Sequence, residues 1–294
     1  MLIPVRDVEY WVEMSGSGKP LVLLHGFTGG HKSWGPYLKS FGQTHRVIAI
    51  DLLGHGKSSA PSDAARYSME QVREDLLALL NLWGFEKIDL LGYSMGGRLA
   101  LHFAVTARER VEKLVLESAS PGIESSQARS ERRRADEALA AFIEREGIES
   151  FVEYWTQLPL FATQRKLSPE IQAQNRCQRL GNQAQGLANC LRGMGTGVQY
   201  SLWDSLRYLT IPTLVLAGAL DGKFCSIGAA MQDVLPCGHF MIIPQSGHTI
   251  HMEQPELFRE AILDFLNEKK MSVLQVFRKE WENDTIQLED RKNL

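Results

Sequence analysis

The chain has 294 residues, of which 44% are hydrophobic and 23% charged, and its formal net charge is −3. This composition is typical of a globular protein with a sizeable core, and so small a net charge gives no indication of a nucleic-acid partner. No apolar run approaches the roughly 18 residues of a membrane-spanning helix, and the start, MLIPVRDVEYWVEMSG, lacks the apolar stretch of a secretory signal. We therefore expect a cytoplasmic protein with one large domain or two modest ones.

Short apolar runs bounded by turn residues predict the strands of one sheet. In chain order they are 20–26, 45–51, 87–94, 111–118, 211–218 and 239–247. Because these runs are continuous rather than alternating, we expect strands that are covered on both faces, as in a parallel sheet. Amphipathic segments lie between them; segment 68–84 has Ser68 and Gln71 at capping-box spacing and ends at Gly84. The sequence therefore predicts an α/β fold with a mostly parallel central sheet flanked by helices.

The alternation of strands and helices stops between about residues 124 and 199, where the chain reads as helical and is rich in Arg, Gln and Ala. Strand-like segments before and after this stretch are alike, so we expect a helical insertion in one sheet domain. We expect 1–123 and 200–270 to form the two parts of the core. Segment 124–199 is expected to be a lid over the carboxyl ends of the strands, where open α/β sheets bind ligands. Residues 271–294 are a charged tail to which we assign no role.

The stretch GYSMG, residues 92–96, fits the G-x-S-x-G nucleophile elbow, with a predicted strand before it and a predicted helix after it. A serine hydroxyl needs a base, and the base needs an orienting carboxylate. Asp221 follows one predicted strand, and His248 lies in the loop after the next. The chain order Ser94, Asp221, His248 is typical of the α/β-hydrolase fold. We predict that these residues form a catalytic triad.

The loop HGFTGG, residues 25–30, follows the first predicted strand of the core. We expect the backbone N–H groups of Phe27 and Met95 to converge as an oxyanion hole. The loop could instead cradle a phosphate, but it lacks the GK[ST] ending of a P-loop. His25 and His55 are expected to support loops rather than to act as bases, and His251 is expected to have a structural role or to support the residues that contact the ligand.

The four cysteines are widely spaced and form no CxxC pair, so we expect buried free thiols rather than a disulfide framework or a zinc site. They are Cys177, Cys190, Cys225 and Cys237. No cluster of residues has metal-ligand spacing, and no metal is proposed.

These features resemble the α/β-hydrolase superfamily over about residues 8–268. More narrowly, they resemble the 2-succinyl-6-hydroxy-2,4-cyclohexadiene-1-carboxylate synthases of menaquinone biosynthesis. The resemblance rests on GYSMGGRLAL, ALDGKF, GHTIHMEQPELF and FVEYWTQLPLF. It implies a lyase that eliminates pyruvate from a polycarboxylate substrate, with no acyl-enzyme and no cofactor. Ser94, activated by His248 and Asp221, would abstract a proton or relay it, and the Phe27 and Met95 amides would stabilise the enolate.

A substrate with several carboxylates needs permanently charged groups that bind in a bidentate way, and Arg does this better than Lys. Arg98 lies one turn into the helix that follows Ser94. From the family pattern we add Arg133 and Arg179 of the lid as ligand contacts, and we expect the other lid arginines to be solvated. The predicted substrate-binding set is completed by Tyr93, Trp155, Phe161, Lys223 and Phe224, of which Trp155 and Phe161 would form an apolar wall.

Two alternatives stay open. The same triad could serve an ordinary serine hydrolase, either an esterase or a C–C bond hydrolase, through a covalent intermediate. The fold could also carry a non-catalytic ligand-binding protein that retains the triad. For the lyase we expect a small polycarboxylate substrate as the only partner, neither nucleic acid nor a membrane span, and a monomer or weak homo-oligomer.

Overall fold

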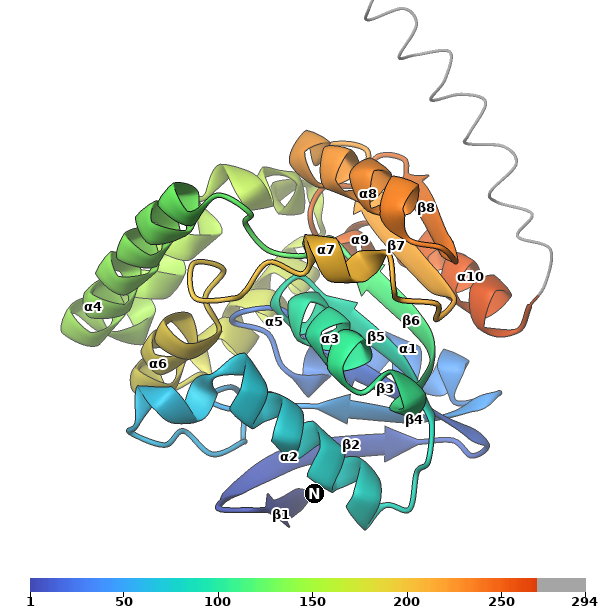
Figure 1. Cartoon of the computed structure of the whole chain (residues 1–294). Helices are drawn as coiled ribbons and strands as arrows, with labels where there is room; N and C mark the ends of the chain where they lie inside the picture. Colours follow the sequence, from blue (N-terminus) through green and yellow to red (C-terminus); the bar gives the residue numbers. More distant parts are fainter. Residues whose placement is uncertain (269–294) are drawn as a thin grey trace, which may run out of the picture.

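The computed structural model describes residues 1–268 and contains one eight-stranded sheet with helices on both faces (Figure 1). The strands are β1 (Leu2–Val5), β2 (Val8–Ser15), β3 (Lys19–Leu24), β4 (His45–Ile50), β5 (Ile88–Tyr93), β6 (Val111–Glu117), β7 (Thr213–Gly218) and β8 (Gly238–Ile243). Their order across the sheet is β1-β2-β4-β3-β5-β6-β7-β8. Strands β3 to β8 pair in parallel, so the predicted fold class is confirmed.

Strands β1 and β2 were not predicted from the sequence. They form an antiparallel hairpin at one edge of the sheet, and β2 also pairs antiparallel with β4. In β2 buried and exposed residues alternate, whereas every residue of β7 is buried. An edge hairpin with one exposed face lacks the continuous apolar run by which the other strands were recognised.

The helices pack on the sheet in two layers. They are α1 (Gly35–Phe41), α2 (Met69–Leu82), α3 (Met95–Thr106), α7 (Trp203–Leu206), α8 (Gly222–Val234), α9 (Ile250–Glu253) and α10 (Pro255–Leu266). One apolar core joins α2, α3 and α8 to one face of the sheet, and the other joins α1 and α10 to the opposite face (Figure 1). Both faces of the central strands are therefore removed from water, which explains their continuous apolar sequence.

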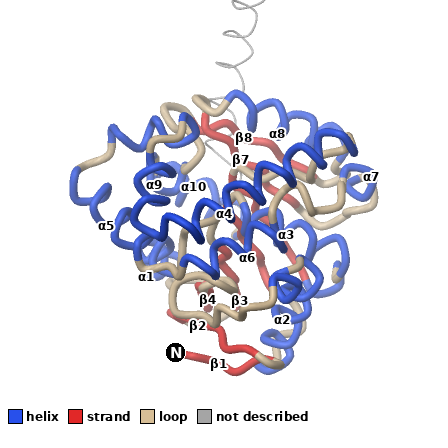
Figure 2. The backbone as a smooth tube through the Cα atoms, turned by 90° about the vertical axis from the view of Figure 1, so that its left-hand side faces the viewer, coloured by secondary structure: helices blue, strands red, loops and turns tan. Residues whose placement is uncertain are grey.

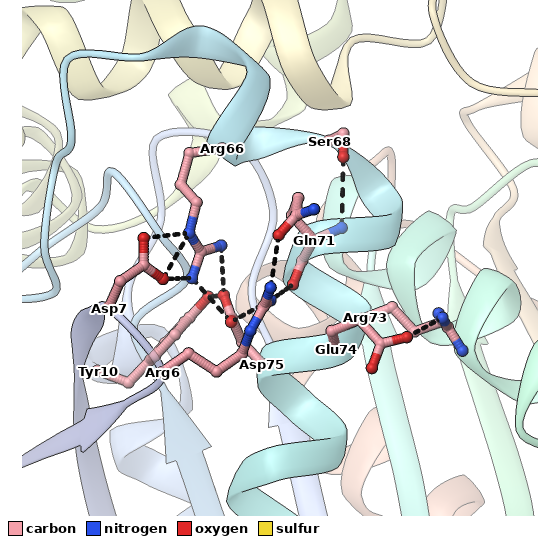
Figure 3. A network of polar contacts seen from close by, with 9 residues as sticks. All are labelled: Arg6, Asp7, Tyr10, Arg66, Ser68, Gln71, Arg73, Glu74 and Asp75. Atoms are coloured by element: carbon pink, nitrogen blue, oxygen red, sulfur yellow. Dashed lines mark hydrogen bonds and ion pairs between the residues drawn. The ribbon is translucent and has the colours of Figure 1, made fainter.

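A polar cluster attaches the β1–β2 hairpin to α2 (Figure 3). Asp75 of α2 is fully buried and accepts hydrogen bonds from Arg66 at 2.8 Å, Arg6 at 3.0 Å and the Tyr10 hydroxyl at 2.7 Å. Arg66 also donates to Asp7, at 2.9 Å. This paired cluster satisfies a buried carboxylate that would otherwise be very costly.

The N-terminus of α2 shows half of the predicted capping box. The Ser68 hydroxyl accepts a hydrogen bond from the Gln71 backbone N–H at 3.3 Å, as expected. The Gln71 side chain does not return to Ser68, because its oxygen accepts a hydrogen bond from Arg6 instead (Figure 3). The predicted start of the helix is thus confirmed, and its capping is one-sided.

Residues 118–212, between β6 and β7, form no strand; before α7 they contain α4 (Ser126–Thr156), the 3₁₀ segment η4 (Pro159–Lys166), α5 (Pro169–Leu180) and α6 (Ala184–Met194). Gly147 has a non-helical backbone (φ 79°, ψ 176°), so α4 is two helices joined at a kink. Figure 2, turned by 90° from Figure 1, shows α4 and α6 in front of the strands. This helical segment, here called the lid, occupies the stretch in which a lid was expected.

Two short 3₁₀ segments also matter for the fold, η1 (His31–Trp34) after β3 and η2 (Ala64–Tyr67) beneath α6; a third, η3 (Arg108–Arg110), precedes β6. Within residues 1–268, no helix is both long and apolar enough to cross a membrane. The tail expected at 271–294 lies outside the described residues.

Candidate active site

The turn between β5 and α3 holds Ser94 in a strained conformation, with φ 50° and ψ −107°. Two glycines make this turn possible. A Cβ atom on Gly92 would overlap the carbonyl oxygen of Gly96, and one on Gly96 would overlap the carbonyls at the end of β3. The Ser94 backbone N–H donates to the Glu117 carbonyl at 2.8 Å. The serine is thus presented at the carboxyl end of the sheet, as in a nucleophile elbow.

The structure brings Ser94, Asp221 and His248 together at this edge. The His248 Nε2 atom lies 3.0 Å from the Ser94 Oγ atom, and its Nδ1 atom lies 2.8 Å from Asp221 Oδ2. Asp221 follows β7, and His248 follows β8 and is 3% exposed. With Nδ1 donating to the carboxylate, Nε2 is free to accept the serine proton, which is the arrangement of a serine–histidine–aspartate triad.

The predicted oxyanion-hole residues Phe27 and Met95 line the same cavity as Ser94. Met95 is the first residue of α3, where backbone N–H groups have no partner within the helix. The positive end of the helix dipole also lies at this point. The start of a helix beside Ser94 suits a developing negative charge, and the oxyanion hole of Phe27 and Met95 stays a prediction.

A buried network holds the loop that carries Phe27. His25 is fully buried; its Nε2 accepts from the Leu52 N–H at 2.9 Å, and its Nδ1 lies 2.8 Å from the Gly26 carbonyl. Asp51 accepts hydrogen bonds from the backbone N–H of His31 at 2.6 Å and from its ring at 2.8 Å. Burial would raise the pKa of Asp51, but these hydrogen bonds from His31 lower it below its ordinary value. Through its contacts with Gly26 and Leu52, His25 supports the loop, as expected.

A cavity of about 270 Å³ opens beside the triad, between the sheet edge and the lid. Its charged lining consists of Arg98, Arg132 and Lys223. Among the described residues, no aspartate or glutamate lines it. A cavity with several cations and no acid favours an anionic ligand.

Arg98 is the most buried of these cations, at 9% exposed. Its side chain forms no ion pair within residues 1–268, and its Nη1 donates to the neutral amide oxygen of Gln199 at 2.8 Å. Burial lowers the pKa of Arg98 to about 10. Arg98 therefore stays charged at neutral pH and is bonded to no carboxylate of the described residues; Asp136, which accepts from Arg132, only partly offsets the effect of burial on this pKa.

The structure places Arg133, which was predicted as a ligand contact, outside the catalytic cavity, and Arg132 lines the cavity instead. Arg133 is exposed on α4 and does not line the cavity, whereas Arg132 does. The Arg132 Nε atom donates to Asp136 at 2.8 Å, and Asp136 is buried on the inward face of α4. Residues one turn apart share a face, and successive residues do not. The buried positions Asp136 and Ala140 therefore mark the face that includes Arg132.

Arg179 is buried, but it lines an adjoining cavity of about 380 Å³ rather than the one beside the triad. Phe161 lies between the two cavities and lines both. The Arg179 guanidinium lies 4.9 Å from the centre of the Phe161 ring and donates to Gln164 at 3.1 Å. Burial lowers the pKa of Arg179 to about 10. The structure thus separates Arg179 from Arg98, although both were predicted to bind ligand.

The remaining predicted contacts surround His248. Tyr93, Trp155, Phe161, Lys223 and Phe224 all line the catalytic cavity. The rings of Phe224 and Tyr93 lie 4.7 and 5.5 Å from the His248 ring. Trp155 contacts Phe161 and Phe27, with ring centres 5.6 and 5.3 Å apart. The aromatic side chains among them give the cavity an apolar wall.

Other expected residues have supporting positions. His251 is buried and pairs with Glu117, with its Nδ1 atom 2.8 Å from the carboxylate, and it does not line the catalytic cavity. Of the four cysteines only Cys190 is buried, while Cys177 and Cys237 are exposed, so the expectation of buried thiols is wrong for those two. Residues 1–268 contain no group of three potential metal ligands.

Comparison with known proteins identifies the family. A model of the alpha/beta hydrolase fold family matches residues 19–255. A Bacillus subtilis (strain 168) relative, to which 2-succinyl-6-hydroxy-2,4-cyclohexadiene-1-carboxylate synthase activity is provisionally assigned, is 44% identical over 90% of this chain and 97% of its own length. The solved structure of MenH from S. aureus is 38% identical, with a TM-score of 0.85 over 89% of this chain and 98% of that one.

A thermophilic esterase from Thermogutta terrifontis, solved with malate bound, is 31% identical, with a TM-score of 0.79 over 92% of this chain and 98% of that one. The fold is therefore shared with hydrolases, whereas the B. subtilis relative and the S. aureus MenH are more similar in sequence to this chain than the esterase is. The chain belongs to the alpha/beta hydrolase fold family and, within it, to the 2-succinyl-6-hydroxy-2,4-cyclohexadiene-1-carboxylate synthases.

Proposed function

We propose that this protein is a carbon–oxygen lyase of menaquinone biosynthesis. Its reaction eliminates pyruvate from 2-succinyl-5-enolpyruvyl-6-hydroxy-3-cyclohexene-1-carboxylate to give 2-succinyl-6-hydroxy-2,4-cyclohexadiene-1-carboxylate. One observation carries the proposal: the triad faces a cavity lined by three cations and, among the described residues, by no acid. The relatives named above support the reaction type.

The proposed chemistry starts with proton abstraction. His248 Nε2, 3.0 Å from Ser94 Oγ, accepts the serine proton, and Ser94 Oγ takes the proton from the substrate carbon next to the succinyl carbonyl. Asp221 keeps the imidazole oriented and stabilises its positive charge. Ser94 is thus the end of a proton relay, and no bond forms between serine and substrate.

The electron pair that this proton leaves behind moves onto the carbonyl oxygen as an enolate. The N–H groups of Phe27 and Met95 would stabilise that oxygen, and the positive end of α3 adds to their effect. When the enolate collapses, the double bonds of the ring become conjugated and the C–O bond to the enolpyruvyl group breaks. The released enolpyruvate takes up a proton and becomes pyruvate, so that atoms and electrons balance.

The carboxylates of the substrate would be held by Arg98, Arg132 and Lys223, and the ring by the wall of Trp155 and Phe161. Arg gives bidentate contacts that fix a carboxylate in orientation as well as in position. Arg179, in the adjoining cavity, would meet a carboxylate only if the substrate reached past Phe161. Fixing the substrate in this way lowers the barrier through orientation.

A serine hydrolase is the second candidate, because the triad distances are also those that a covalent mechanism needs. The 31% identical esterase supports this reading of the fold, and its bound malate is a dicarboxylate. The two candidates differ in whether Ser94 becomes acylated.

The deciding experiment is an assay of pyruvate release from the authentic enolpyruvyl substrate, with an ester panel alongside. We expect pyruvate release by the wild type and its loss in Ser94→Ala, with no ester turnover. Ser226→Ala, at an exposed serine of α8, is the control and should keep full activity. Rapid ester hydrolysis with a trapped acyl-enzyme, and no pyruvate, would establish the hydrolase instead.

The proposal includes three further properties: a reaction that needs no cofactor, a cytoplasmic location, and a monomer or weak homo-oligomer. Activity of protein dialysed against a chelator tests the first, cell fractionation the second and sedimentation velocity the third. A stable large oligomer would contradict the last.

A further inference from the structure

Gln199 is the single protein partner of the Arg98 side chain within the described part of the chain. It lies between α6 and α7, 101 residues after Arg98, and is 3% exposed. Its Oε1 atom accepts the hydrogen bond from Arg98 Nη1 at 2.8 Å. Arg98 lines the catalytic cavity, while Gln199 lines a separate cavity. Gln199 does not line the catalytic cavity, so it contacts the guanidinium from outside that cavity.

The chemistry of this partner matters because an amide oxygen accepts a hydrogen bond without carrying a charge. A glutamate of the same length would accept the same bond and also neutralise the guanidinium. Arg98 Nη1 gives one N–H to Gln199, and the other N–H groups of the guanidinium have no partner within residues 1–268. The charge and these donors are left for a ligand.

The other end of the amide argues against a purely structural role. Gln199 Nε2 is buried and has no hydrogen-bond partner among the described residues. An unpaired buried donor is destabilising, so a side chain kept only for stability would be expected to satisfy both ends. The satisfied end is the one that faces Arg98.

We propose that Gln199 is a positioning residue that directs the Arg98 guanidinium into the catalytic cavity while leaving its charge free for a carboxylate of the substrate. This inference rests on the proposed function, because it assigns a specificity role within the same site. It explains why the hydrogen-bond partner of this buried cation is a neutral side chain rather than an acid.

Gln199→Glu tests the proposal, because it preserves length and hydrogen bond but cancels the charge. We expect KM for the enolpyruvyl substrate to rise at least tenfold, with a smaller fall in kcat, since the lost interaction holds the substrate before and during the reaction. The melting temperature should stay the same or rise. If the role of Gln199 were only structural, the KM of Gln199→Glu would lie closer to the wild-type value than the KM of Gln199→Met.

The matched control is Gln71→Glu. Gln71 Oε1 also accepts from an arginine at 2.8 Å, but that arginine is Arg6 in the paired cluster of the hairpin and α2 (Figure 3). The same chemical change there should leave KM unchanged. Gln199→Met keeps the charge of Arg98 but removes its support, so its KM should rise less than tenfold. If Gln199→Glu fails to fold, a Gln199→Met variant with wild-type KM would overturn the positioning role.

A binding measurement separates this inference from the proposed function. Succinate, a simple dicarboxylate, should raise the melting temperature of the wild type and of Gln71→Glu, and should have little effect on Gln199→Glu. This outcome supports the role of Gln199 even if pyruvate release is absent. The proposal is overturned if succinate stabilises Gln199→Glu as much as the wild type, or if it stabilises neither.

Discussion

Two arginines of this protein are equally buried, at 9% exposed, and differ in their partners. Arg66 donates to two carboxylates, those of Asp75 and Asp7 (Figure 3), whereas Arg98 donates to the neutral amide of Gln199. Burial would lower the pKa of Arg66, but the hydrogen bonds to Asp75 and Asp7 raise it. Burial lowers the pKa of Arg98 to about 10, and Asp136, which forms no hydrogen bond to Arg98, offsets this only in part.

The contrast shows how the surroundings of a buried cation separate stability from function. The fully paired Arg66 fixes the hairpin to α2, and no charge is left over for a ligand. Arg98 stands at the wall of a cavity beside the triad, where its charge is free to meet a substrate. Buried groups whose charge is uncompensated tend to gather at functional sites.

The largest effect is expected for Arg66→Met, which leaves the buried Asp75 short of its main partner. Arg6 and Tyr10 still donate to Asp75, so we expect a loss of about 3 kcal/mol in the free energy of unfolding. Urea unfolding measures this loss, and kcat/KM of the folded variant should match the wild type. A large fall in kcat/KM with unchanged stability would reverse the assignment of the two arginines.

Arg98→Met should show the opposite pattern. We expect kcat/KM to fall about a hundredfold, equivalent to about 2.7 kcal/mol, because the substrate loses a charged contact. The free energy of unfolding should fall by about 1 to 2 kcal/mol, less than in Arg66→Met, because Gln199 Oε1 loses its donor but no buried carboxylate is left unpaired. Arg134→Met, at an exposed arginine of α4, is the control. Activity within threefold of wild type would remove Arg98 from the site.

The comparison extends to His55, a buried histidine that burial keeps uncharged. Burial lowers the pKa of His55 to about 3, while an unfolded histidine has a pKa near 6.5. Between these values only the unfolded chain binds the proton, so stability falls as the pH is lowered. From His55 alone we expect a loss of about 2 kcal/mol between pH 8 and pH 5.

Urea unfolding of wild type and His55→Gln at both pH values checks this expectation. The variant should lose less stability on acidification, and His239→Gln, at an exposed histidine, should behave like the wild type. Equal losses in wild type and His55→Gln would show that other groups control the acid sensitivity.

The parts of the fold that the sequence predicts depend on local signals. Strands β3 to β8 are continuous apolar runs bounded by turn residues, so each is recognisable alone, and their parallel order follows from the helices between them. The hairpin of β1 and β2 is stabilised by Asp75 of α2, a partner far along the chain. Buried and exposed residues alternate in both strands, and β1 has only four residues, which leaves a weaker pattern.

The residues of the site also divide into those with a local sequence signal and those without one. The proposed triad residues follow strands, and the carboxyl ends of parallel strands share one edge, so Ser94, Asp221 and His248 were expected to be neighbours. The choice between Arg132 and Arg133 depends on the rotation of α4 about its axis, which the periodicity of Asp136 and Ala140 could have indicated. Nothing local marks Gln199, because its partner is 101 residues away.

The smallest effect is expected from the N-terminal caps of two helices. One is α2, beside the Arg66 cluster, and the other is α4, beside the catalytic cavity. The Ser68 hydroxyl caps α2, which carries Asp75, and the Ser125 hydroxyl caps α4, which carries Arg132; their distances to the capped N–H are 3.3 and 3.2 Å. Replacing either serine by alanine should lower the free energy of unfolding by about 1 kcal/mol.

Only the lid variant should change catalysis. In Ser125→Ala the first turns of α4 fray and Arg132 is less well held, so KM should rise about twofold, a small effect because Arg132 is one of several cations. Ser68→Ala should leave KM unchanged, because the paired cluster contributes no group to the cavity. Steady-state kinetics beside urea unfolding measures both quantities. A change in KM for Ser68→Ala would mean that the hairpin cluster and the cavity are coupled, and that the two buried arginines do not act independently.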